Sequence, residues 1–119
     1  MGEGRAEGSA GVTPASAIAY LRVSTSAQAD SGLGLEAQEA ACRVTAAQLG
    51  AEVRGVHTDT MSGTLAMAER PALLDAIAAL REGDALIVAR RDRLGRDVVN
   101  VALIERAVTQ RGARVVSAA

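Results

Sequence analysis

The sequence of 119 residues contains no lysine, tryptophan or phenylalanine, and it has one tyrosine, one histidine and one cysteine. With Tyr20 as the single aromatic side chain, the core has to be built from valine, isoleucine, leucine and alanine. The lone thiol of Cys42 cannot form an internal disulfide, and no cysteine and histidine cluster has the spacing of a metal site. These absences favour one globular domain in a reducing compartment such as the cytoplasm, and they leave metal-centred chemistry without a candidate site.

Long apolar runs are also missing. No segment approaches the ~20 apolar residues that a membrane-spanning helix needs, and residues 1–16 contain no hydrophobic stretch of the signal-peptide kind. The formal net charge of -1 argues against binding to a polyanion over the whole surface. All 13 basic residues are arginine, and one dense group consists of Arg90, Arg91, Arg93 and Arg96. Because a guanidinium makes forked contacts with phosphate or carboxylate, this group is a candidate binding site.

The apolar pattern alternates between strand and helix spacing after residues 1–16, which are rich in glycine and serine and are expected to be a flexible extension. Strands are expected at residues 17–23, 51–57, 84–89 and 113–117, and helices at 34–49, 71–83 and 98–111. This order predicts an α/β fold with a mostly parallel central sheet flanked by helices. In such sheets, function gathers in the loops at the carboxyl ends of the strands, which begin here at Arg22, Thr58 and Arg90.

Each expected helix has one apolar face that should pack against the sheet. In the first helix this face consists of Leu35, Cys42, Ala46 and Leu49. In the second it consists of Leu73, Ile77 and Leu80, and in the third of Val98, Val101, Ile104 and Val108. Cys42 is therefore most simply a thiol of the core.

Ser24 and Arg22 follow the first expected strand at a spacing of two, so both side chains lie on one face of an extended segment. A hydroxyl beside a guanidinium suits attack on a phosphate, because the cation offsets the charge that develops during transfer. Ser24 also fits a residue that turns the chain at a strand end, and the group around Asp92 also fits a solvated surface turn. In the functional interpretation, Asp92 holds an arginine in place or moves a proton. The lone His57 fits a structural role.

The segment GLGLEA, at residues 32–37, resembles a dinucleotide-binding fingerprint that precedes a helix. In that fingerprint the glycines follow the strand directly, whereas residues 24–31 separate Val23 from Gly32 here. A nucleotide-binding enzyme therefore stays as an alternative that thermal stabilisation by a dinucleotide would support.

Five segments in a fixed order carry a broader resemblance: YLRVST, GLEAQ, TDTMSG, RPALLDAI and LREGDALIVARRDRLGRD. Together, over residues 17–117, they resemble the catalytic domain of the serine recombinases, the resolvase and invertase family of site-specific DNA recombinases. RVST at residue 22 followed by DRLGR at residue 92 is the most specific part. The resemblance implies a resolvase-like three-layer fold, double-stranded DNA as partner, no cofactor, and a homo-oligomer that passes from dimer to tetramer.

The resemblance also implies a role for each matching residue. Ser24 matches the nucleophile, which attacks a DNA phosphate, forms a 5′-phosphoserine link and frees a 3′-hydroxyl before the reverse attack reseals the DNA. The arginines that match those binding the scissile phosphate are Arg22, Arg70, Arg93 and Arg96. Asp92 matches an aspartate that orients these groups or assists proton transfer, and Gln38 matches an active-site amide. The matching supporting residues are Tyr20, Asp59, Ser62 and Gly63.

Family members continue beyond the last expected strand into further catalytic segments, a long dimerisation helix and a DNA-binding domain. We therefore expect residues 17–119 to be an N-terminal catalytic domain without its C-terminal part and DNA-binding domain. Two functions of different class follow: DNA strand exchange, or an inactive recombinase remnant that acts at most as an interaction or dimerisation module. Specific, salt-sensitive binding to a DNA site separates them. These motifs do not distinguish resolution, inversion, integration and transposition.

Overall fold

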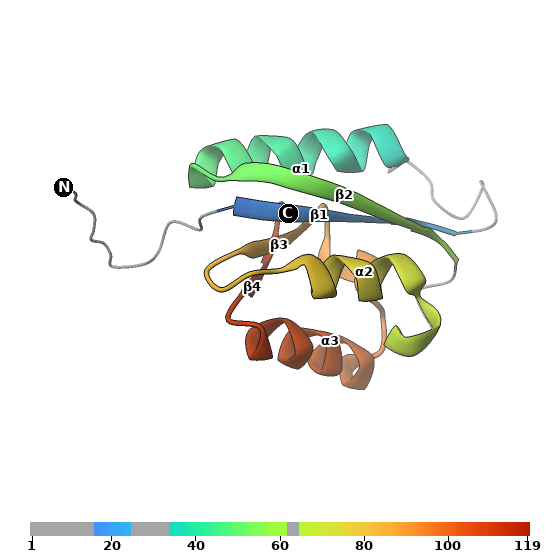
Figure 1. The fold of residues 1–119 in the computed structure, drawn as a ribbon. Helices are drawn as coiled ribbons and strands as arrows, with labels where there is room; N and C mark the ends of the chain where they lie inside the picture. The colour runs from blue at the N-terminus through green and yellow to red at the C-terminus, as the bar shows by residue number, and fades with distance from the viewer. Residues whose placement is uncertain (1–15, 25–33, 62–64) are drawn as a thin grey trace.

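Strands and helices alternate along the chain in the computed structural model, which describes residues 16–24, 34–61 and 65–119 (Figure 1). The strands are β1 (Ser16–Val23), β2 (Glu52–Thr60), β3 (Ala85–Val88) and β4 (Arg114–Ser117). The α-helices are α1 (Leu35–Leu49), α2 (Pro71–Ala79) and α3 (Val98–Gln110), with the short 3₁₀ helices η3 (Met67–Glu69) and η4 (Arg91–Arg93). The predicted α/β order is confirmed.

The strands form one sheet in the order β2-β1-β3-β4, and each neighbouring pair is parallel. The central strand β1 is buried from its first residue to Arg22, as expected for a strand covered on both faces. Because the strands are parallel, the carboxyl ends of β1, β2 and β3 meet at one edge of the sheet, the carboxyl edge. The three loops singled out in the sequence therefore leave the sheet at the same edge.

Helices cover both faces of this sheet, with α1 on one face and α2 and α3 on the other (Figure 1). On the α1 side the buried residues are Ala17, Ala19, Leu21, Cys42, Ala46, Ala85 and Ile87. On the opposite side, β1 and β3 pack against the apolar faces of α2 and α3 through Leu73, Ile77, Ile104 and Val108, among others. The three-layer arrangement is confirmed. Within the described ranges, no helix is long and apolar enough to cross a membrane.

Cys42 lies in the core between α1 and the sheet, as predicted. Its thiol contacts the carbonyl oxygen of Ile87 at 3.6 Å. Burial, assisted by the charge of Glu39, raises the pKa of the Cys42 thiol to about 11. The thiol therefore stays protonated at neutral pH and acts as a packing group.

Two residues assigned to the core by periodicity are exposed instead. Leu35 is 38% exposed and Val98 is 82% exposed. Each is the first residue of its helix, α1 or α3, and both helices begin at the carboxyl edge of the sheet. Helical periodicity gives the direction of a side chain but not where the opposing layer ends.

The four strands each start one residue away from expectation and β3 ends one residue early, while larger differences occur at the end of β2 and at α2, which ends at Ala79 rather than near Gly83. β2 continues to Thr60 rather than ending at His57, because β1 pairs with it as far as the register Val23 to Thr60. β1 begins at Ser16, which we had placed in the extension. The Ser16 hydroxyl is buried and donates a hydrogen bond to Asp84 Oδ1 at 2.7 Å. The rest of the expected extension, residues 1–15, lies outside the described residues.

Candidate active site

The expected site residues come from separate segments that meet at the carboxyl edge. β1 supplies Tyr20 and Arg22 near its end, and Ser24 follows directly, partly exposed. The other elements contribute Gln38 from α1, Asp59 from β2, Arg70 just before α2, and the η4 turn with Asp92, Arg93 and Arg96. Ser62 and Gly63 lie outside the described residues. The sequence segments that carry the resemblance are thus neighbours in space.

Arg22 fastens the end of β1 to the η4 turn. The side chain is 2% exposed. Its Nε donates to the carbonyl oxygen of Arg93 at 3.0 Å, and Nη2 donates to that of Asp92 at 3.1 Å. A third donor, Nη1, reaches the carbonyl oxygen of Met61 at 2.9 Å, just past the end of β2. One guanidinium therefore ties together the ends of β1 and β2 and the turn that follows β3.

Arg70 approaches the same turn from the α2 side and is fully buried. Nη2 donates to the carbonyl oxygen of Arg93 at 2.8 Å, and Nη1 donates to that of Leu94. The last carbonyl groups of a helix have no partner inside the helix, and cationic side chains bind them favourably. Arg22 and Arg70 thus act as side-chain caps at the C-terminal end of η4.

Tyr20 and Asp59 form a second layer beneath Arg70. The Tyr20 hydroxyl accepts a hydrogen bond from Nη2 of Arg70 at 3.0 Å and donates to Oδ2 of Asp59 at 2.8 Å. Asp59 also accepts from the backbone amides of Ala72 and Leu73 at 2.9 and 3.0 Å, which caps the start of α2. Burial raises the pKa of the Tyr20 phenol well above its usual range, so it remains a neutral donor.

Gln38 is fully buried and holds the backbone at the end of β1. Its Nε2 donates to the carbonyl oxygen of Arg22 at 3.0 Å, and its Oε1 accepts from the amide of Arg22 at 3.2 Å. Nη1 of Arg93 donates to the same Arg22 carbonyl oxygen at 3.0 Å. The chain segment that leads into Ser24 is therefore fixed from both α1 and η4.

Asp92 is the carboxylate of the η4 turn. Nε of Arg93 donates to its Oδ1 at 3.2 Å, and Nη2 of Arg90 lies 3.7 Å from its Oδ2. Burial acts to raise the pKa of Asp92. The hydrogen bond from Arg93 and the charges of Arg93, Arg90 and Arg96 outweigh burial and lower this pKa below its usual range. Asp92 is thus ionised at neutral pH and is held as an anion by the arginines around it.

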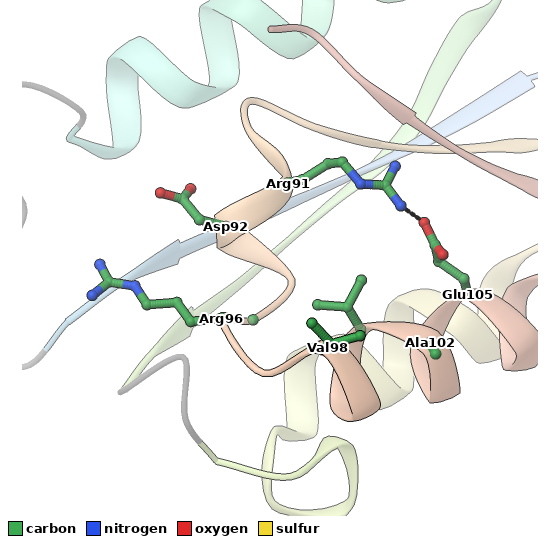
Figure 2. Close-up of a pocket in the computed structure, with 8 residues that line it drawn as sticks. Arg91, Asp92, Arg96, Val98, Ala102 and Glu105 are labelled. Carbon is green, nitrogen blue, oxygen red and sulfur yellow. Dashed lines mark ion pairs between the residues drawn. The ribbon is translucent and has the colours of Figure 1, made fainter.

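A hollow of about 550 Å³ opens beside the η4 turn (Figure 2). Its lining residues are Arg91, Asp92, Gly95, Arg96, Val98, Val101, Ala102 and Glu105. Figure 2 shows the side chains of Asp92 and Arg96 directed to one side, while Arg91 turns the other way to form an ion pair with Glu105. Arg96 is exposed, unlike Arg22, Arg70 and Arg93. The arginines that the resemblance groups together therefore divide into one on the surface and three inside.

A second polar cluster lies at the opposite, amino edge of the sheet, where the partly exposed Arg54 side chain bonds to the buried residues Ser16 and Asp84, and the sequence reasoning missed it. Arg54 donates from Nε to the Ser16 hydroxyl at 2.7 Å and from Nη2 to Asp84 Oδ2. Asp84 also accepts from the amide of Arg81 at 2.8 Å. Desolvation acts to raise the pKa of Asp84, but the hydrogen bonds from Ser16, Arg81 and Arg54 lower it overall. The sequence feature that could have indicated this cluster is a polar residue at the start of, or directly before, two buried strands.

Comparison with known proteins identifies the family of this domain. Residues 17–119 match the family of resolvase N-terminal domains. The chain belongs to this family. The recognition of a serine recombinase catalytic domain from the sequence motifs is confirmed, and the resolvase-like domain is that of a DNA recombinase enzyme. No curated protein sequence matched significantly.

Solved structures of serine recombinase catalytic domains share this fold. The N-terminal catalytic domain of TP901-1 integrase aligns with a TM-score of 0.70 at 28% identity, over 86% of this chain and 77% of that one. The C-terminal catalytic domain of IS1535 TnpA, an IS607-like serine recombinase, gives 0.63 at 31% identity, over 85% and 69%. A serine recombinase from Sulfolobus solfataricus gives 0.61 at 26% identity, over 87% and 68%. The roles of individual site residues stay predictions.

Proposed function

We propose that this resolvase domain performs site-specific recombination with Ser24 as the nucleophile. The Ser24 oxygen attacks a backbone phosphorus of double-stranded DNA, so that a 5′-phosphoserine bond forms while the bond to the 3′-oxygen breaks. The serine proton passes to a base, and the departing 3′-oxygen takes up a proton. Attack by a 3′-hydroxyl in the reverse direction reseals the strand. The observation that carries this proposal is the position of Ser24, directly after β1 at the edge where the arginines and Asp92 converge.

The surrounding charge suits transfer of a phosphoryl group, which depends mainly on positioning and on electrostatic stabilisation. We assign direct contact with the scissile phosphate to Arg96, because it is exposed beside the η4 turn. Arg93 contributes from just below the surface, where its guanidinium bonds to Asp92 and to the end of β1. The ionised Asp92 orients Arg93, whose guanidinium it binds. Gln38 keeps the segment before Ser24 in place.

Double-stranded DNA is the proposed partner, together with further copies of the same chain. Exchange between two duplexes requires four strand cuts, and each domain carries one Ser24. We therefore propose a dimer that becomes a tetramer when two sites come together. An integrase and a TnpA protein among the structural neighbours support action on mobile DNA. We place the reaction in the cytoplasm, in keeping with the free thiol of Cys42.

Covalent capture tests the proposal. The chain is incubated with a pool of nicked duplexes of randomised sequence, and protein-linked DNA is separated on a denaturing gel. The wild type should form the adduct, and Ser24→Ala should abolish it without changing the unfolding temperature. Ser117→Ala, which removes a half-buried hydroxyl on β4, is the matched control and should retain the adduct. An adduct that survives in Ser24→Ala removes Ser24 from the role of nucleophile. DNA binding without any wild-type adduct would favour an inactive remnant.

A further inference from the structure

We propose that Arg70 is a positioning residue that holds the η4 turn from inside the domain and thereby directs Arg93 and Arg96 toward DNA, without touching DNA itself. This inference rests on the proposed function, since it concerns the same edge of the sheet. It gives Arg70 a different task from the direct phosphate contact that the sequence resemblance implies. The distinction follows from burial, from the partners of the guanidinium and from the position of those partners in the chain.

The Arg70 guanidinium is committed to protein oxygens on every side. All three of its nitrogens donate: Nε and Nη2 to the Tyr20 hydroxyl at 3.3 and 3.0 Å, Nη2 also to Arg93, and Nη1 to Leu94. The side chain is 0% exposed. A fork of this kind has five N–H donors in a fixed plane, so it cannot turn toward a phosphate without giving up several of these bonds. Leaving the carbonyl oxygens buried and unpaired would add a further cost.

The two carbonyl groups that Arg70 binds lie in the chain directly before Gly95 and Arg96. A hydrogen bond to a carbonyl oxygen fixes the plane of its peptide group, and two successive fixed planes determine the direction in which the chain continues. Arg22 binds one of the same oxygens, that of Arg93, from the β1 side. The exposed Arg96 therefore leaves a turn that is clamped from beneath by two buried cations.

The Tyr20 hydroxyl and Asp59 determine where Arg70 itself lies. Tyr20 presents one oxygen to two donors of the guanidinium, and its ring centroid is 5.4 Å from the guanidinium carbon. Asp59 holds that hydroxyl and also caps α2, whose first residue follows Arg70 directly. Asp59 thus fixes both the backbone next to Arg70 and the oxygen that its side chain binds. The support runs from Asp59 through Tyr20 and Arg70 to η4.

Nuclear magnetic resonance of the arginine Nε–H groups tests this in the unaltered chain. A short duplex oligonucleotide is titrated at low salt while the Nε–H signals of Arg70 and Arg96 are followed. We expect the Arg96 signal to shift and the Arg70 signal to stay in place with slow hydrogen exchange. A shift of the Arg70 signal as large as that of Arg96 overturns the inference. If neither signal moves, the failure belongs to the proposed DNA site at this edge, and the next measurement decides about Arg70.

That measurement uses Tyr20→Phe, which removes one oxygen and keeps the buried ring. We expect faster exchange of the backbone amides of Arg93 and Leu94, and an adduct rate at saturating DNA about tenfold lower with unchanged DNA affinity. Ser16→Ala removes another buried hydroxyl from β1, at the amino edge, and should alter neither quantity. Unchanged exchange at both amides in Tyr20→Phe contradicts the inference, even where the DNA site itself has failed.

The salt dependence of DNA binding separates positioning from contact in a second way. Loss of one phosphate contact lowers the slope of log affinity against log salt by about 0.9. Arg96→Gln should show this loss, whereas Arg70→Gln should keep the wild-type slope and lose adduct formation. A slope lowered equally in both variants would mean that Arg70 contacts a phosphate, which overturns the proposal. The exchange measurement on Tyr20→Phe stands in if Arg70→Gln does not fold.

Discussion

Arginine side chains bond to buried groups at both edges of the central sheet, but Arg70 is fully buried at the carboxyl edge, whereas the Arg54 side chain at the amino edge is partly exposed. At the amino edge, Arg54 bonds to the buried carboxylate of Asp84, and Ser16 bonds to both. At the carboxyl edge, Arg70 donates to two carbonyl oxygens and a phenol, and within the described ranges it forms no ion pair. A charge that is neutralised inside the fold has little left to offer a ligand. A charge held by neutral oxygens keeps its field available at the surface above it.

This difference concerns Arg70, since the other buried arginine of the η4 turn, Arg93, does pair with the carboxylate of Asp92. Carbonyl dipoles orient a guanidinium and replace its water without cancelling its charge, and a preorganised charge near a reacting phosphate is the main requirement of this chemistry. At the amino edge, Arg54 reaches across from β2 to bond Asp84 ahead of β3, and it also donates to the last carbonyl oxygen of α2, that of Ala79. That cluster joins elements of the fold.

The largest expected effect comes from the exposed arginine of the carboxyl edge. Arg96→Lys should lower the rate of adduct formation about 100-fold, because a single ammonium cannot replace a fork aimed at a phosphate. The unfolding temperature should stay unchanged, since the side chain is exposed. Single-turnover capture of nicked duplex DNA measures the rate. Arg106→Lys on the exposed face of α3 is the matched control. Near-normal capture by Arg96→Lys would show that Arg96 does not contact the phosphate.

A smaller effect of the opposite kind is expected at the amino edge. Arg54→Met removes the cation but keeps the apolar stem, which leaves the Asp84 carboxylate buried with only Ser16 and the Arg81 amide as donors. The free energy of unfolding should fall by about 1–2 kcal/mol, because the buried Asp84 carboxylate loses one donor while water can reach the partly exposed place of Arg54. Urea denaturation measures this, and the folded variant should keep the wild-type adduct rate. If Arg54→Met were as stable as the wild type but formed no adduct, the amino edge would have a role in the reaction, which contradicts the difference proposed between the two edges.

The smallest expected effect is a dependence on pH. Burial acts to raise the pKa of Asp84, but the bonds from Ser16, Arg81 and Arg54 lower it in the folded state. A depressed carboxyl pKa stabilises the fold above the pKa of the unfolded chain, near 3.9 for aspartate, and this contribution is lost as the pH falls through the lower folded value. The gap in unfolding free energy between wild type and Asp84→Asn should therefore narrow below about pH 4. A constant gap from neutral pH to pH 2 would contradict a depressed pKa.

Much of the fold could be predicted because the strands are short apolar runs between clear helix stops. The buried stretch of β1 and the apolar face of α2, with Leu73 and Ile77, follow directly from local patterns. Leu35 and Val98 show the limit of such patterns, because exposure at the edge of a layer depends on where the neighbouring layer ends. The polar start of β1 was missed for the same reason, since Ser16 owes its burial to a residue 68 positions away.

The residues that form the site could also be predicted from the sequence, whereas which of its arginines are buried and which is exposed could not. The segments around Ser24 and Arg93 identified the carboxyl edge as the site, because their residue types, in this fixed order, are typical of the family. Which arginine faces solvent depends on backbone carbonyls, and every residue has one. The bond between Arg22 and the carbonyl oxygen of Arg93 spans 71 positions and exists only because η4 turns its last carbonyls inward. Such contacts use backbone atoms, so they do not require a particular amino acid at the accepting position and cannot be recognised from the sequence.

The order of the site residues along the chain also governs when a growing chain acquires its complete set of groups. The segment with Ser24 is synthesised early. The two strands that pair with β1, first β2 and then β3, follow it along the chain. Arg70 emerges between these two strands, and Arg93 and Arg96 emerge after the second. A ribosome-bound fragment therefore carries the serine without the cations at residues 93 and 96. Under the proposed chemistry, the nucleophile and its phosphate-binding cations are therefore together only after residue 96 has been synthesised.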